Sequence, residues 1–245
     1  MNGACPGPAG RRRKGRLPFD VLFEDGDLIV IDKPEGLLAV HTLLHGRAAR
    51  EAQATAENLL NDYVRKGQPK SRRRVWLVHR LDRDTSGVMV FAKSGEVADS
   101  LRAHWADVTE KTYIAEVEGV MDAGQGVFES WLREDADGYR VRSVPPPKEK
   151  KGGASAEPGA RPAKFARTEW RVLGRGRRGT RVEVKLKTGR KNQIRVQFAG
   201  AGHPVVGDVK YGAHRAPRMF LHSAELRLVH PRTRETLVFA SPAPF

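Results

Sequence analysis

Short runs of apolar and β-branched residues, separated by turn-forming residues, recur along most of the chain. Arg181–Lys187 is the clearest predicted strand, because charged and apolar residues alternate strictly there and successive side chains of a strand point to opposite faces. Two Asp-Gly steps, Asp25-Gly26 and Asp137-Gly138, are typical of hairpin turns. Further strands are predicted at Asp20–Glu24, Leu28–Ile31, Val75–Val78, Val88–Ala92, Lys111–Gly119, Phe128–Arg133, Tyr139–Val144, Phe165–Trp170, Phe220–Ala224 and Thr236–Phe239. The pattern therefore predicts a long, largely antiparallel sheet.

Three segments instead show the spacing of helices that bury one face. Thr55–Arg65 begins at an N-cap threonine, and a second helix begins after Ser94 and extends to about Val108. A short third helix follows Asn192, which we expect to cap it. Together with the strands, these helices predict a mixed α/β protein of the α+β class, in which helices flank the sheet around a central basic cleft.

The composition is that of a single folded unit with one substantial core. The chain has 245 residues, of which 39% are hydrophobic. We expect residues 1–17 to be a disordered basic tail and residues 18–245 to form one domain, with a mobile loop at 145–162. No apolar run has transmembrane length, no secretory signal is visible, and Cys5 has no partner for a disulfide. These features predict a cytoplasmic protein without a membrane partner, and a monomer is the default expectation.

Basic residues are concentrated in two regions. The net charge is +15, with 44 Lys and Arg against 29 Asp and Glu. Five basic residues and no acidic one lie in 1–17, and thirteen basic against two acidic residues lie in 171–218. Such segregation is typical of a face that binds a polyanion, above all a nucleic acid.

The polar segment His79–Gly87 holds two arginines and two aspartates between two apolar runs. A carboxylate beside arginines stays ionised and can act as a nucleophile or as a base. No nucleotide-binding or metal-binding motif is visible in the chain. The residues alone therefore indicate chemistry at a carboxylate, without a cofactor or a metal ion, on nucleic acid. Two other functions stay open, namely nucleic-acid binding without turnover and metal-dependent hydrolysis by Asp82 and Asp84.

The same segment resembles a known motif. His79-Arg80-Leu81-Asp82, followed by Thr85-Ser86-Gly87, is similar to the catalytic motif of the RluA family of RNA pseudouridine synthases. Further segments are similar to other motifs of that family, in the family's order: Val21–Val40, Lys111–Tyr113, Ala166–Thr168, Thr188–Gly212 and Phe220–Pro231. The resemblance extends from about Phe19 to Phe245, and we expect the type of relative in which no RNA-binding domain precedes the catalytic domain.

The resemblance implies the pseudouridine synthase fold and the isomerisation of uridine to pseudouridine in structured stem-loops of ribosomal or transfer RNA. The target base would flip into a pocket, and the reaction needs no cofactor and no metal ion. Asp82 would be the catalytic carboxylate, which either attacks the sugar or removes its 2′ proton. Arg195 would pair with Asp82 through a two-toothed fork. Tyr113 would stack on the uracil and could assist removal of the proton on carbon 5.

The resemblance also implies a set of substrate-binding residues. Arg80 would fill the space left by the flipped base or hold the displaced phosphate, and Leu221 would line the apolar side of the pocket. His79, Arg190 and Lys33 are the other expected substrate-binding residues.

The chain departs from the family pattern at two positions. Asn192 and Gln197 stand where the family commonly has histidine. Asparagine can cap a helix and form hydrogen bonds as histidine does, so we expect the departure to affect the choice of RNA more than the type of reaction.

Overall fold

The computed structural model describes residues 17–41, 54–68, 70–147, 161–177 and 179–245. The predicted basic tail lies outside the described residues except for Leu17, and so does most of the predicted loop at 145–162.

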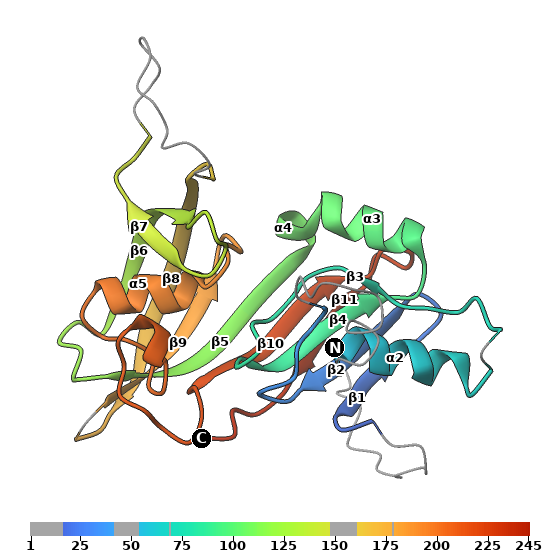
Figure 1. The fold of residues 1–245 in the computed structure, drawn as a ribbon, viewed down its shortest axis with the longest axis horizontal. Coiled ribbons are helices and arrows are strands. Elements are labelled where there is room, and N and C mark those ends of the chain that lie inside the picture. The colour runs from blue at the N-terminus through green and yellow to red at the C-terminus, as the bar shows by residue number, and fades with distance from the viewer. Residues whose placement is uncertain (1–16, 42–53, 69, 148–160, 178) are drawn as a thin grey trace, which may run out of the picture.

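The strands form one eleven-stranded sheet (Figure 1). Its main path runs β1-β2-β4-β10-β5-β9-β8-β6-β7, while β3 pairs with β4 and β11 pairs with β10. Within the described ranges, β4 and β10 make the one parallel pairing, which confirms the prediction of a largely antiparallel sheet. The strands are β1 Asp20–Glu24, β2 Leu28–Lys33, β3 Trp76–Leu77, β4 Ser86–Ala92, β5 Thr109–Glu118, β6 Gln125–Glu134, β7 Val141–Val144, β8 Lys164–Arg175, β9 Gly179–Leu186, β10 Leu221–Val229 and β11 Thr236–Ala240.

Few helices accompany the sheet. They are α2 Ala56–Arg65, α3 Gly95–Ala103, α4 Trp105–Val108, α5 Gln193–Gly200 and the short 3-10 helix η1 Val209–Tyr211. The predicted caps of the first two are confirmed, since the side chain of Thr55 accepts a hydrogen bond from the backbone of Asn58 and that of Ser94 accepts one from Val97. In the part of the chain that the structure describes, no helix is long and apolar enough to cross a membrane.

Three local predictions were wrong in detail. The single helix expected from Ser94 to Val108 is broken at His104 into α3 and α4. The strand expected at Val75–Val78 is only the two-residue β3, because the next backbone N–H along this edge of β4, that of Val90, donates to the ring of His79 and not to the chain of β3. Asn192 precedes α5 but makes no side-chain cap, because its backbone is left-handed and its side chain is directed elsewhere.

The apolar runs of β2 and β4 are continuous because both faces of these strands are covered. Ile31 and Met89 belong to the core cluster under α2, whereas Val30 and Val90 belong to the cluster under α3. All seven residues of β4 are buried. Burial on both faces removes the polar alternation that a half-exposed strand would show.

The strand β5 joins two halves of the sheet. One neighbour of β5 is β10, which leads to β4, β2 and β1, and its other neighbour is β9, which leads to β8, β6 and β7 (Figure 1). The helix α5 packs on the second half, where Ile194 and Phe198 join the same core as Val182 and Val184. The segment before β4 and the segment before α5 therefore belong to different halves of the sheet.

Gly87 is required where β4 begins. Its φ is +113°, and a Cβ atom there would lie 2.3 Å from the backbone oxygen of Ser223. Only glycine permits this approach of β10 to β4. The close pairing fixes the end of the loop that carries Arg80, Asp82 and Thr85.

Candidate active site

A pocket of about 250 Å³ opens where the two halves of the sheet meet. Two segments, two strand ends and Tyr113 within β5 form its walls, so the pocket is built from residues that are far apart in sequence. The lining residues are Arg80, Leu81, Asp82, Thr85, Tyr113, Leu186, Gly189, Arg190, Lys191, Asn192, Gln193, Ile194, Arg195 and Leu221. Four of these are basic and one is acidic, which suits a negatively charged ligand around a single carboxylate.

Asp82 lies in the loop between β3 and β4. Its side chain is 25% exposed, and its backbone oxygen accepts a hydrogen bond from the backbone N–H of Thr85. The neighbouring Arg83 carbonyl is held by the backbone N–H of Gly36 and by the ammonium of Lys33. The loop is therefore anchored on both sides of the carboxylate, which keeps Asp82 at the pocket.

Arg195 is held by two carboxylates. Its Nη1 donates to Oδ2 of Asp82 at 3.1 Å, while its Nε and Nη2 donate to Asp208 at 2.6 and 2.7 Å. The expected ion pair between Arg195 and Asp82 is present, but the two-toothed fork is formed with Asp208 instead. Burial alone would lower the pKa of Arg195, but the hydrogen bonds and charges of Asp208 and then Asp82 raise it above its ordinary value. Arg195 is a fixed cation that faces Asp82 with a single N–H.

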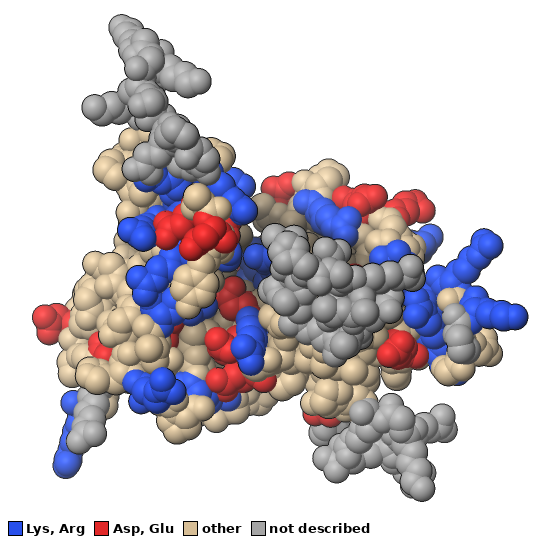
Figure 2. Space-filling view, viewed as in Figure 1, with Lys and Arg blue, Asp and Glu red and all other residues tan. Residues whose placement is uncertain are grey.

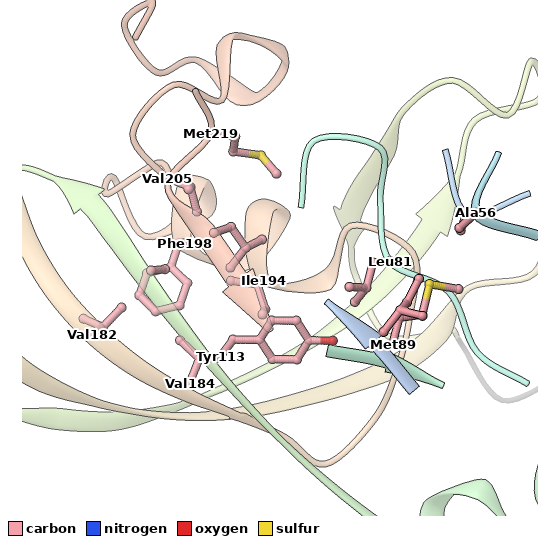
Figure 3. Close-up of a cluster of buried hydrophobic side chains, with 14 of the residues drawn as sticks. Ala56, Leu81, Met89, Tyr113, Val182, Val184, Ile194, Phe198, Val205 and Met219 are labelled. Carbon is pink, nitrogen blue, oxygen red and sulfur yellow. The ribbon is translucent and has the colours of Figure 1, made fainter. Parts of the chain in front are cut away.

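Tyr113 and Leu221 form part of the apolar side of the pocket. Tyr113 extends from β5 and lies in the core with Val184 and Ile194, and its hydroxyl end is directed toward Leu81 (Figure 3). Burial raises the pKa of Tyr113 to about 12, so the phenol keeps its proton at neutral pH. Leu221, at the start of β10, is 3% exposed. Both residues leave little of their surface free, so they shape the pocket by their packing.

Arg80 and Arg190 lie at the exposed part of the pocket. Both belong to its lining and both are exposed. Arg190 donates from Nε to the backbone oxygen of Phe165, which places it beside β8. Two exposed guanidinium groups at the mouth of the pocket can bind phosphates.

His79 and Lys33 are not brought to the pocket. The ring of His79 stacks on Trp105, its Nε2 accepts a hydrogen bond from the backbone of Val90, and burial lowers the pKa of His79 to about 3. Lys33 is fully buried, and its Nζ donates to the carbonyl oxygens of Pro34, Leu37 and Arg83. In this structure neither side chain is available for a substrate, because each already has its partners inside the fold.

Asp208 is the main residue of the site that sequence reasoning missed. Its side chain is 1% exposed and it fixes Arg195 from the side opposite Asp82. A signal was available, because Asp208 is one of only two acidic residues in the basic region 171–218. Asp84, considered for a hydrolytic pair with Asp82, is half exposed and absent from the pocket lining. Among the described residues, no group of three His, Cys, Asp or Glu side chains could hold a metal ion.

Basic side chains also gather away from the pocket. Figure 2 shows them at one end of the molecule, over the loop that joins α2 to β3. Within residues 66–74 this loop carries Lys66, Lys70, Arg72, Arg73 and Arg74 and no acidic residue. In the described ranges none of the five forms a salt bridge, unlike Arg171 on Glu183 or Arg232 on Asp27.

Comparison with known proteins shows to which family the chain belongs. The sequence profile of RNA pseudouridylate synthases matches residues 27–200, which include Asp82, Tyr113 and Arg195. The tRNA pseudouridine synthase C of Vibrio parahaemolyticus is 31% identical over 240 residues, which cover 91% of this chain and 89% of that protein. The chain belongs to the RluA-type family of RNA pseudouridine synthases. Members of this family are RNA isomerases, and the resemblance inferred from the sequence motifs is confirmed.

Other members of the RluA-type family extend this comparison. The ribosomal large subunit pseudouridine synthase D of Nitrosomonas europaea is 33% identical over 246 residues, which cover 93% of this chain; the chain spans 63% of that relative's length. Among solved structures, human RNA pseudouridylate synthase domain containing 4 superposes with a TM-score of 0.71 at 24% identity, over 91% of this chain and 88% of that chain. The predicted mixed α/β fold of the pseudouridine synthases is thereby confirmed.

Proposed function

We propose that this protein isomerises particular uridines of ribosomal or transfer RNA to pseudouridine, with Asp82 as the catalytic carboxylate. The observation that carries the proposal is the position of Asp82. It is the one carboxylate in the pocket lining, and it faces the fixed guanidinium of Arg195 at 3.1 Å. The printed names of relatives, which include both ribosomal and transfer RNA enzymes, support these two classes of substrate.

The isomerisation breaks the bond between nitrogen 1 of uracil and carbon 1′ of the sugar, turns the base, and joins carbon 5 to carbon 1′. One proton leaves carbon 5 and one is gained at nitrogen 1, so no redox agent is consumed. An ionised Asp82 serves either of two routes, attack on carbon 1′ or removal of the 2′ proton. Arg195 offers Asp82 one N–H and a positive charge at 3.1 Å, which favours a negative charge on the carboxylate before the reaction.

The remaining lining residues suit a base that has left its helix. A nucleotide inside a duplex cannot reach a pocket of this depth, so the target base must flip out of the stack. The ring of Tyr113 offers a flat face for the uracil, and Leu221 offers an apolar wall. Because its pKa is about 12, Tyr113 is better suited to stacking than to acting as a base before substrate binds. Arg80 and Arg190 at the mouth are suited to phosphates of the displaced strand.

The protein is also proposed to act as a monomer in the cytoplasm. The carboxylate of Asp82 and the guanidinium of Arg195 supply the charged groups that the proposed isomerisation uses. Stem-loops are the favoured targets, because a base in a loop costs less to flip than a base in a duplex.

Pseudouridine mapping tests the proposal. Total RNA from cells with and without the gene is mapped, and the deletion strain is complemented with the wild type, Asp82→Asn or Asp84→Asn. We expect one or a few sites to be lost and then restored by the wild type and by Asp84→Asn, because Asp84 is outside the pocket lining. Asp82→Asn should not restore them. Unchanged sites in the deletion strain, or restoration by Asp82→Asn, would refute the proposal and favour RNA binding without turnover.

A further inference from the structure

Asn192 has an unusual backbone for a residue that starts a helix. Its φ is +53° and its ψ is 22°, in the left-handed region, and its side chain forms no cap with α5. Asparagine and glycine adopt this conformation at the lowest cost among the natural residues. Asn192 is 7% exposed and belongs to the pocket lining, so its side chain is directed into the site that contains Asp82.

The neighbours of the Asn192 amide determine its orientation. A carboxylate can only accept hydrogen bonds, and an ammonium group can only donate them. When the amide nitrogen of Asn192 faces Asp82, it donates to Oδ2 at 2.7 Å and lies 3.2 Å from Oδ1. In the same orientation the amide oxygen accepts from the ammonium of Lys210 at 3.2 Å and from the hydroxyl of Tyr211 at 2.8 Å. The opposite orientation keeps a bond to Tyr211, with the amide donating to its hydroxyl at 2.8 Å, and has a 3.4 Å contact from Arg195, but it sets the amide oxygen against the carboxylate and the amide nitrogen against the ammonium of Lys210.

A second donor to Asp82 matters because Arg195 supplies only one N–H. Two of the nitrogens of Arg195 are engaged by Asp208, so Arg195 alone leaves the carboxylate of Asp82 free to rotate about its single hydrogen bond. The amide of Asn192 removes this freedom. Both donors converge on Oδ2, and Oδ1 retains only the longer contact.

We propose that Asn192 is a positioning residue for the catalytic carboxylate, which fixes the plane of Asp82 so that Oδ1 is the oxygen offered to the sugar. The inference rests on the proposed function, since it assigns a task to Asp82. Hydrogen bonds to charged groups are stronger than those between neutral groups, so the loss of this bond should slow the chemical step roughly ten- to hundredfold. RNA binding should change little, because Asn192 is buried behind the exposed arginines at the mouth of the pocket.

Two substitutions distinguish the effect of the Asn192 amide from the effect of its left-handed backbone conformation. Asn192→Gly keeps the left-handed conformation and removes the amide. Asn192→Asp keeps the size and the backbone preference but sets a second carboxylate against Asp82. The matched control is Arg234→Gly, because Arg234 also has a positive φ of 62° but is exposed and lies outside the pocket lining.

The measurement is single-turnover pseudouridine formation, together with the dissociation constant for the RNA, on an unmodified transcript of the RNA identified by mapping. We expect Asn192→Gly to lose roughly ten- to hundredfold in rate with RNA affinity within about twofold, Asn192→Asp to lose more, and Arg234→Gly to match the wild type. A rate for Asn192→Gly within about twofold of the wild type, or a loss explained entirely by weaker RNA binding, would overturn the inference. If Asn192→Gly does not fold, Asn192→Asp decides alone, and a wild-type rate in that variant also overturns it. A wild-type protein that forms no pseudouridine would instead refute the proposed function itself.

Discussion

Replacing Asp82 or Asp208 with asparagine should harm the protein in opposite ways. Both aspartates contact the same guanidinium of Arg195, and both substitutions remove one negative charge with almost no change in shape. They differ in burial and in the number of hydrogen bonds. Asp82→Asn should abolish turnover and spare stability, whereas Asp208→Asn should mainly reduce stability.

The cost of Asp208→Asn follows from its burial. The Asp208 side chain is 1% exposed, that of Arg195 is 8% exposed, and two hydrogen bonds of 2.6 and 2.7 Å join them. Removing one partner of a buried pair costs about 3–5 kcal/mol, because the remaining charge is left inside without compensation. In addition, an asparagine amide would direct N–H groups at the N–H groups of Arg195. For a protein of this size, the loss corresponds to a decrease in Tm of roughly 6–20 °C.

Asp82→Asn should cost far less stability. The Asp82 side chain is 25% exposed and shares only one hydrogen bond of 3.1 Å with Arg195, which keeps its fork with Asp208. Pairs with solvent access contribute about 0–1 kcal/mol. Turnover should nevertheless decrease by roughly 10⁴-fold or more, because the substitution removes the carboxylate that we propose to be catalytic.

Urea unfolding and pseudouridine formation should be measured on the same preparations of both variants, with Asp84→Asn as the exposed control. The argument from burial would be refuted if Asp208→Asn unfolded within about 1 kcal/mol of the wild type. It would also be refuted if Asp82→Asn lost as much stability as Asp208→Asn.

Three further predictions rest on other features. Burial lowers the pKa of Lys33 from 10.5 to about 8. Between these two pH values the unfolded chain therefore binds more protons at this residue than the folded chain does. As a result, Lys33 makes the free energy of unfolding increase with pH in this range. The stability advantage of the wild type over Lys33→Met in urea should therefore widen by roughly 2 kcal/mol from about pH 7.5 to about pH 10, and a constant difference would contradict the buried charge. Gly87→Ala should lose roughly 3–5 kcal/mol in the same assay, because its Cβ would meet the backbone of β10 at 2.3 Å. Gly124→Ala, which meets nothing within 4 Å, should lose much less, and equal losses would count against the close approach. Changing Arg72, Arg73 and Arg74 together to Gln should reduce the slope of log affinity against log salt for RNA by about 1–3, whereas an unchanged slope would mean that this basic loop makes no phosphate contacts.

Much of the fold could be predicted because its signals are local. Strict alternation identified β9, and the continuous apolar run of β4 indicated burial on both faces. The caps at Thr55 and Ser94 follow from short-range hydrogen bonds that a few residues determine. The position of β10 between β4 and β5 could not be predicted in this way, because no local pattern states which distant strand will pair.

The motifs predicted a set of site residues, most of which the structure gathers at one pocket. The residues that the motifs misplaced or missed share one cause. Lys33 and His79 are polar residues in or beside loops, where side chains are usually exposed, but Lys33 is buried and the ring of His79 is engaged by Trp105 and Val90. Asp208 and Asn192 acquire their tasks only when α5 and the segment after it fold back over Asp82. The environment of each of these four residues is set by tertiary packing, which cannot be read from the sequence around a single residue.

The position of β10 between β4 and β5 also determines when, during synthesis of the chain, the two halves of the sheet can join. While the chain is being made, β4 and β5 emerge early and have no direct pairing with each other; the strand that joins them comes almost last. Until β10 is available, the loop of Asp82 and the helix of Arg195 belong to separate pieces of sheet. A chain that ends before β10 lacks the strand that joins the two walls of the pocket. Non-local pairing of this kind makes folding slow, but it ties the appearance of the site to the completion of the fold.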